Sequence, residues 1–217
     1  ELDSFESDLI VGIYHLKNEQ TNQAKKYFLK IKKRNSNFAL NTFLSNSLLN
    51  WSSFDKLNIS QAKKKIDEID PQFKNLSDIE NLFMHCFYES TKTESFFKKL
   101  TTNDKIDYSR FNYFYATYLL NSNKIDQAKK VIKSSLKLYP RNLLINQYKI
   151  DLNNNKNRTR FDCKKQAHVV AEILYITANA LSSQSIYKFS NFYLNLAKYL
   201  NNEFYSFDAL LAENFYK

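Results

Sequence analysis

The residues of this chain that could ligate a metal or act as nucleophiles are few and far apart. The histidines are His15, His85 and His168, and the cysteines are Cys86 and Cys163. His85 and Cys86 are adjacent and therefore point to different sides of a helix. Cys163 and His168 have no further ligand at the spacing of a zinc site. The spacing therefore predicts no metal site and no catalytic residue.

Other kinds of site chemistry are also disfavoured. A phosphate-binding loop needs several glycines, and the chain has one. The sequence contains no nucleophile elbow. We therefore expect no enzyme activity, no cofactor and no small-molecule substrate. Because disulfides are rare outside oxidising compartments, we also expect no bond between Cys86 and Cys163.

Positive charge is concentrated in one region. The net charge is +10, and residues 108–170 hold 13 Lys and Arg against 3 Asp and Glu, whereas the remainder is balanced at 19 against 19. The residues expected to form a basic patch are Lys129, Lys133, Lys137, Arg158, Arg160, Lys164 and Lys165. Two interpretations stay open. The region is either a solvated outer face, or it docks an acidic protein, an anionic lipid or non-specific nucleic acid.

The elements that would carry these residues are short helices. With one glycine, two prolines and no alternation of apolar and polar residues, the sequence favours an all-α fold. The clearest stretch runs from Arg110 to Pro140 and reads as two amphipathic helices, the second with Ile125, Ile132 and Leu136 facing inward. Pro140 should end that second helix near Tyr139.

Small residues recur at a fixed separation along the chain. Gly12 and Ala24, Ala116 and Ala128, and Ala178 and Ser190 are each 12 residues apart. Ser135 and Ala197 follow seven residues after the second and third of these pairs, and Ala212 would open a last half-unit. A large side chain at these positions would push antiparallel helices apart. We therefore predict that these residues, with Pro140, set the packing of repeated helix pairs.

This pattern resembles the tetratricopeptide repeat, a helix pair of about 34 residues, although Asn112 stands where that repeat has a tryptophan. The resemblance implies a right-handed α-solenoid of antiparallel helix pairs with about five units. The expected units are 5–38, 39–73, 74–108 (degenerate), 109–142, 171–204 and a partial unit at 205–217, with an insertion at 143–170.

In such a solenoid the first helices line a concave face that binds a peptide or helix of a partner protein. The residues expected on that face are Leu9, Ile13, Arg110, Tyr113, Thr117, Glu172, Tyr175 and Asn179. Chaperone-binding members of the repeat superfamily use a Lys and an Asn there to clamp a carboxylate. Tyr175 and Asn179 match only half of that pair, so a peptide groove of mixed polarity is the better prediction.

Residues 171–217 are similar to the later region of an alphaproteobacterial family of tetratricopeptide proteins, with Tyr193, Leu194, Leu196 and Ala197 in a "YLxLAxYL" helix. That similarity implies a longer bacterial parent, often exported, of which this chain is an interior fragment. It leaves a cytoplasmic and a periplasmic location equally open. No run approaches the roughly 20 apolar residues of a membrane span, so we expect no transmembrane segment.

Overall fold

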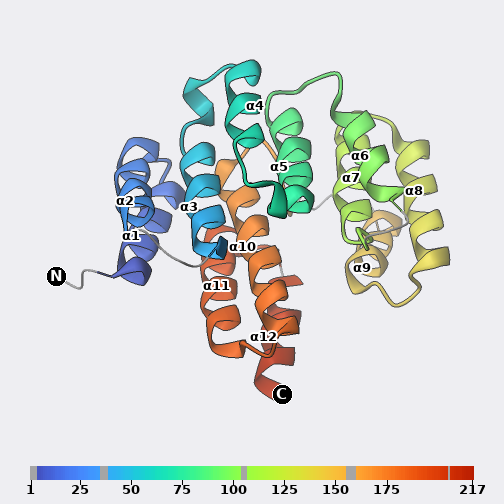
Figure 1. Cartoon of the computed structure of the whole chain (residues 1–217). Coiled ribbons are helices and arrows are strands. Elements are labelled where there is room, and N and C mark those ends of the chain that lie inside the picture. Colours follow the sequence, from blue (N-terminus) through green and yellow to red (C-terminus); the bar gives the residue numbers. More distant parts are fainter. Residues whose placement is uncertain (1–3, 35–38, 104–106, 155–159, 205) are drawn as a thin grey trace. The chain divides into compact units, whose positions relative to one another are not determined.

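The helical periodicity of the sequence appears in the structure as α-helices joined by short turns (Figure 1). The structure is a computed structural model that describes residues 4–34, 39–103, 107–154, 160–204 and 206–217. These residues form twelve α-helices and two short 3-10 helices, and no strand occurs among them. The all-α class is therefore confirmed, while the number of repeats and the hand of a solenoid remain predictions.

The chain packs as two compact units. Unit 1 consists of residues Glu1–Tyr88 and Asp162–Lys217, and unit 2 of residues Glu89–Phe161. The organisation expected from the sequence is one array interrupted at 143–170. The structure instead divides it at Glu89 and Phe161, because α6 to α9 pack on one another.

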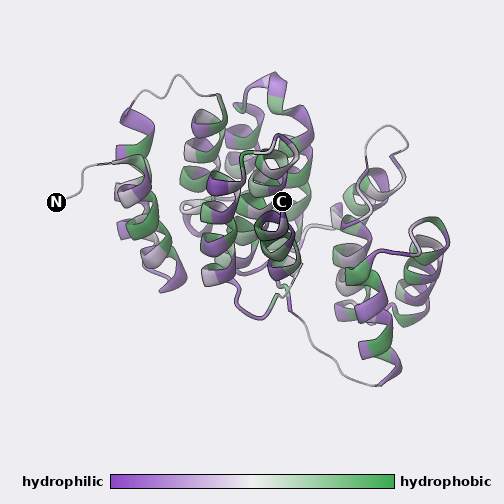
Figure 2. Ribbon diagram, turned by 90° about the horizontal axis from the view of Figure 1, so that it is seen from below, coloured by the Kyte–Doolittle hydropathy of each residue, from purple (hydrophilic) through white to green (hydrophobic). Residues whose placement is uncertain are grey.

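Unit 1 contains eight of the α-helices and both 3-10 helices. They are α1 (Phe5–Lys17), α2 (Thr21–Lys33), α3 (Ala39–Trp51), η1 (Phe54–Lys56), α4 (Ile59–Asp67), η2 (Pro71–Phe73), α5 (Lys74–Phe87), α10 (Gln166–Ser183), α11 (Tyr187–Leu200) and α12 (Ser206–Tyr216). Most helices carry hydrophilic and hydrophobic residues on different sides (Figure 2). The apolar sides bury aromatic rings such as Trp51, Phe28 and Phe207, each less than 2% exposed.

Unit 2 contains four helices. They are α6 (Thr93–Thr101), α7 (Phe111–Asn121), α8 (Ile125–Leu138) and α9 (Leu143–Asn153). α7 packs against α6, α8 and α9, so it forms the centre of the unit. As predicted, α8 ends just before Tyr139, since Pro140 cannot continue it.

The helix pairs share one kind of turn. Four turns each place one non-glycine residue in the left-handed backbone region, with φ between 51° and 62°: Glu19, Glu89, Asn123 and Ser185. In three of them the next backbone N–H donates to a carbonyl five residues earlier: Gln20 to His15, Lys124 to Leu119 and Ile186 to Leu181. This bond is the 6→1 hydrogen bond of the Schellman motif. Glu19, Asn123 and Ser185 each lie seven residues after a predicted packing residue, so the turns recur in the predicted register.

Gly12 explains how closely α1 and α2 approach. A Cβ atom added at Gly12 would lie 2.8 Å from Cδ1 of Phe28 and closer still to Cε1. Phe28 is on α2 and is fully buried, so its ring has little freedom to move away. Gly12 therefore lets α1 and α2 approach closely, and the side chain it accommodates is Phe28.

Replacing Gly12 with alanine should lower the free energy of unfolding, because the new methyl group overpacks the Phe28 ring at a cost of about 1–3 kcal/mol. The loss should outweigh the gain of about 1 kcal/mol in helix propensity. Chemical denaturation of Gly12→Ala measures the effect. In a Phe28→Leu background the same change should be neutral or stabilising, and an equal loss in both backgrounds would contradict the overpacking.

The other predicted packing residues are buried, with two exceptions. Ala24, Ala116, Ala128, Ala178, Ser190 and Ala197 are 0% exposed, and Ser135 is 3% exposed. Ser190 Oγ donates to the Ala178 carbonyl at 2.8 Å, so this pair is in direct contact. Pro140 is exposed and acts only as a helix stop. Ala212, on α12, is also exposed.

The first helix of unit 1 packs against helices that follow unit 2 in the sequence. α1 contacts α10 and α11 as well as α2, and Lys17 Nζ donates to the Leu200 carbonyl at 2.9 Å. In an open solenoid each repeat contacts only its neighbours along the chain. The contact between α1 and α11 is therefore one that the expected linear order does not predict.

A disulfide joins Cys86 and Cys163, with their Cα atoms 5.9 Å apart. The prediction that these cysteines stay unbonded is therefore wrong. Cys86 is at the end of α5, and Cys163 lies just before α10. Both belong to unit 1, and the chain between them includes all of unit 2. The separation of 77 residues hid this proximity, because sequence spacing does not report which helix ends meet.

Candidate functional site

The residues expected on a concave face do not form an open surface. Five of the eight are buried: Leu9, Ile13, Tyr113, Thr117 and Glu172. α1 is covered by α2, α10 and α11, which encloses Leu9 and Ile13. In unit 2 the Tyr113 ring packs edge-on against Tyr148, with centroids 4.9 Å apart. The prediction that these five residues line an exposed peptide-binding face is wrong, because neighbouring helices cover them.

The remaining three residues of that set reach the surface to different degrees. Asn179 is exposed, whereas Arg110 and Tyr175 are half-buried. The Tyr175 ring packs against Phe207, and the Arg110 guanidinium lies over the Phe114 ring. Arg110 and Tyr175 therefore help to hold their own units together.

The residues of the predicted basic patch do not all belong to the same unit. Arg160 forms an ion pair with Asp151 at 3.4 Å, and both side chains are largely buried, so this arginine stabilises unit 2. Lys164 and Lys165 belong to unit 1 and lie just before α10. Arg158 lies outside the described residues. Only three lysines of the set, Lys129, Lys133 and Lys137, lie on α8.

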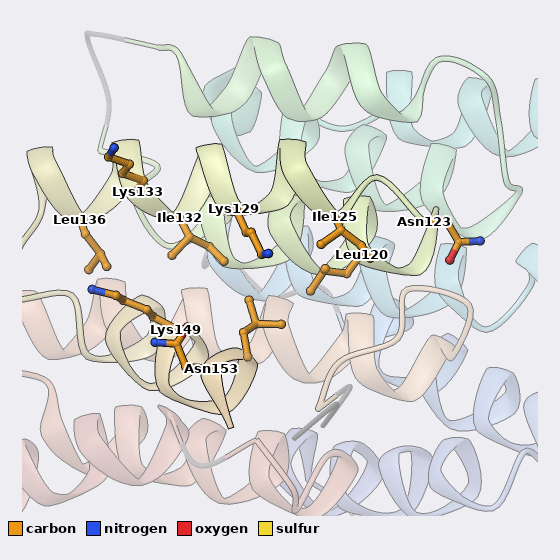
Figure 3. Close-up of a pocket in the computed structure, with 10 residues that line it drawn as sticks. Leu120, Asn123, Ile125, Lys129, Ile132, Lys133, Leu136, Lys149 and Asn153 are labelled. Atoms are coloured by element: carbon orange, nitrogen blue, oxygen red, sulfur yellow. The ribbon is translucent and has the colours of Figure 1, made fainter. Parts of the chain in front are cut away.

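Lys129 and Lys133 line a groove of about 960 Å³ in unit 2, which we call the lysine-rimmed groove (Figure 3). Its lining residues are Leu120 and Asn123 at the end of α7, Ile125, Lys129, Ile132, Lys133 and Leu136 on α8, and Lys149, Leu152 and Asn153 on α9. Lys137 is exposed on α8 but does not line the groove. This groove was not predicted from the sequence.

The floor of the groove is apolar and its rims are basic. Ile125, expected to face inward, is 51% exposed, because α9 leaves the start of α8 uncovered. The lining includes three lysines and no carboxylate. In the described part of unit 2, Lys124 and Lys98 pair with Glu94, but Lys129, Lys133 and Lys149 are in no ion pair. The groove therefore presents uncompensated positive charge beside apolar side chains.

Two of the three histidines, His15 and His168, make contacts within the fold. The backbone N–H of Asp162 donates to Nδ1 of His168 at 3.0 Å, which holds the loop before α10 against that helix. Burial, assisted by the charge of Lys165, lowers the pKa of His168 to about 4, so this ring is neutral at physiological pH. Nδ1 of His15 lies 2.6 Å from Oε1 of Gln20. Among the described residues no group of three His, Cys, Asp or Glu side chains could hold a metal ion.

A buried carboxylate in unit 1 is a further feature that the sequence did not reveal. Glu80 on α5 is 1% exposed, and Ser47 and Trp51 on α3 face it. Burial raises its pKa to about 7, and Ser47 and Trp51 offset this only in part. Neither their polar atoms nor the carboxylate oxygens reach the geometry of a full hydrogen bond. Glu80 lies in the packed interior, so we assign it an effect on stability.

Within the described residues, no helix is long and apolar enough to cross a membrane. No family model, curated protein or solved structure matches the chain. The resemblance to tetratricopeptide repeats therefore stays a prediction from the sequence.

Proposed function

We propose that this protein is a non-enzymatic interaction module that binds an acidic segment of a partner protein in the lysine-rimmed groove of unit 2. The observation that carries the proposal is the combination of an apolar floor with three lysines that no carboxylate of the described unit neutralises. Burial of the exposed half of Ile125 would supply affinity. The lysines would raise the association rate and select for acidic partners.

A peptide bound on the concave face is less well supported, since five of its eight expected residues are buried. Binding of nucleic acid or of an anionic membrane would use the lysines but not the apolar floor. These alternatives predict different partners, so the same experiment can separate them.

Reversing the charge of both groove lysines on α8, in Lys129→Glu/Lys133→Glu, should weaken partner binding at least about tenfold, equivalent to 1.4 kcal/mol. Each new carboxylate would repel the acidic segment and would lack a partner of its own. The matched control is Lys130→Glu/Lys137→Glu, which makes the same change at exposed lysines of α8 outside the groove. This control should bind like the unaltered protein.

The partner can be captured with a photo-crosslinking side chain placed at Asn153, which is exposed and lines the groove. The expected adduct is a protein cross-linked through an acidic segment, lost in Lys129→Glu/Lys133→Glu and absent when the probe is placed at Lys137. Adducts consisting only of lipid or nucleic acid would overturn the proposal, as would equal labelling from both positions.

A further inference from the structure

Among the described residues, helix α9 is not followed by an antiparallel helix that packs against it. α1, α7 and α10 are each followed, after a short turn, by an antiparallel helix against which they pack: α2, α8 and α11. After α9, by contrast, the described residues Asn154, Arg160 and Phe161 are not helical, and unit 2 ends at Phe161. The side of α9 that a second helix would cover has no such helix among the described residues.

The lysine-rimmed groove lies where that second helix would pack. Its walls are α8 and α9, the two helices that a second helix of the α9 pair would touch (Figure 3). The α8 residues that line it run from Ile125 to Leu136 at helical spacing and form one continuous stripe. At 1.5 Å per residue this stripe is about 16 Å long, which corresponds to about three turns of a bound helix.

We infer that the partner segment is an amphipathic α-helix that lies along α8 and completes the α9 pair. This inference rests on the proposed function and specifies the form of the ligand. Apolar side chains of the bound helix at i, i+3 or i+4, and i+7 face Ile125, Ile132 and Leu152. The groove lysines come from both walls, Lys129 and Lys133 from α8 and Lys149 from α9. The bound helix therefore carries carboxylates on both sides of its apolar stripe.

The sequences of peptides selected for binding to the groove show whether the ligand is a helix. A random peptide library displayed on phage is panned against the full chain and, separately, against Lys129→Glu/Lys133→Glu. We expect peptides that bind only the unaltered chain to show apolar residues with helical periodicity, flanked by Asp and Glu, and to contain no proline in the apolar stretch. A proline substituted into the middle of a selected peptide should weaken its binding at least about tenfold, because proline breaks the helix.

The outcomes separate this inference from the function on which it rests. A different outcome is a set of acidic peptides that depend on the groove lysines and yet have apolar and polar residues that alternate with period two, or tolerate a central proline. Such peptides would contradict a helical ligand and leave the proposed function intact. If no enriched peptide depends on the groove lysines, both are overturned. Vesicles of phosphatidylserine that bind the unaltered chain but not the variant, with no peptide enriched, would assign the groove to a membrane surface and overturn both.

Discussion

Removing the disulfide by Cys86→Ala/Cys163→Ala is expected to lower the free energy of unfolding by about 4 kcal/mol. The bond closes a loop of 77 residues that includes the whole of unit 2. Without it, the unfolded chain gains the entropy that loop closure removes, and the entropy of a loop of this length corresponds to an effect of this size. Cys86 is buried, so the alanine also removes some packing around the end of α5.

Urea denaturation of both proteins, with and without a reducing agent, measures this effect. Reductant should destabilise the unaltered protein and leave the double-alanine variant unchanged, which controls for any action of the reductant elsewhere. Equal stability of the oxidised and reduced protein would contradict a structural role for the bond. Because disulfides persist in oxidising compartments and are reduced by cytosolic thiols, the redox state of the protein in its source cells would also report its location.

The local helical features of this fold were predictable from the sequence because they depend on residues that are close along the chain. The 12-residue separation of Gly12 and Ala24, of Ala116 and Ala128, and of Ala178 and Ser190 correctly identified residues buried at the helix pairs. Pro140 correctly ended α8. Such features follow from helical periodicity and turn chemistry, which act over one or two turns of helix.

The contacts between distant helices were not predictable in this way. The packing of α1 against α11 encloses Leu9 and Ile13, and it could not be inferred while each helix was assumed to contact only its sequence neighbours. The Cys86–Cys163 bond was missed because disulfides are rare outside oxidising compartments and because a spacing of 77 residues does not show which helix ends meet. The charge of the groove was partly predictable, since Lys129 and Lys133 were expected in a basic patch. Its apolar floor was not, because Ile125 and Leu136 are indistinguishable from core residues until the position of α9 is known.

Replacing Glu80 with glutamine should stabilise the protein at pH 8 by about 3 kcal/mol. The folded state raises the pKa of Glu80 from 4.5 to about 7 by burying the carboxyl group. Between these two values the folded protein binds more protons than the unfolded chain, so the free energy of unfolding falls as the pH rises. Below pH 4.5 the carboxyl is neutral in both states and costs nothing, whereas above pH 7 the full cost of a buried charge is present.

Glutamine keeps the shape of the side chain without the charge, and its amide can still face Ser47 and Trp51. The variant should therefore match the unaltered protein near pH 4 and exceed it at pH 8, as measured by urea denaturation across this range. The matched control is Glu68→Gln, the same change at an exposed glutamate of unit 1, which should leave the pH profile unchanged.

The single tryptophan of the chain gives a second and more direct readout, because Trp51 faces the Glu80 carboxyl group. Its fluorescence in the folded protein should titrate with a midpoint near 7, and this transition should be absent in Glu80→Gln. A transition that persists in the variant would show that another group is responsible. A glutamine variant that is less stable than the unaltered protein at pH 8 would show that the ionised carboxylate has stabilising partners. In that case the buried charge would be a favourable part of the α3–α5 packing.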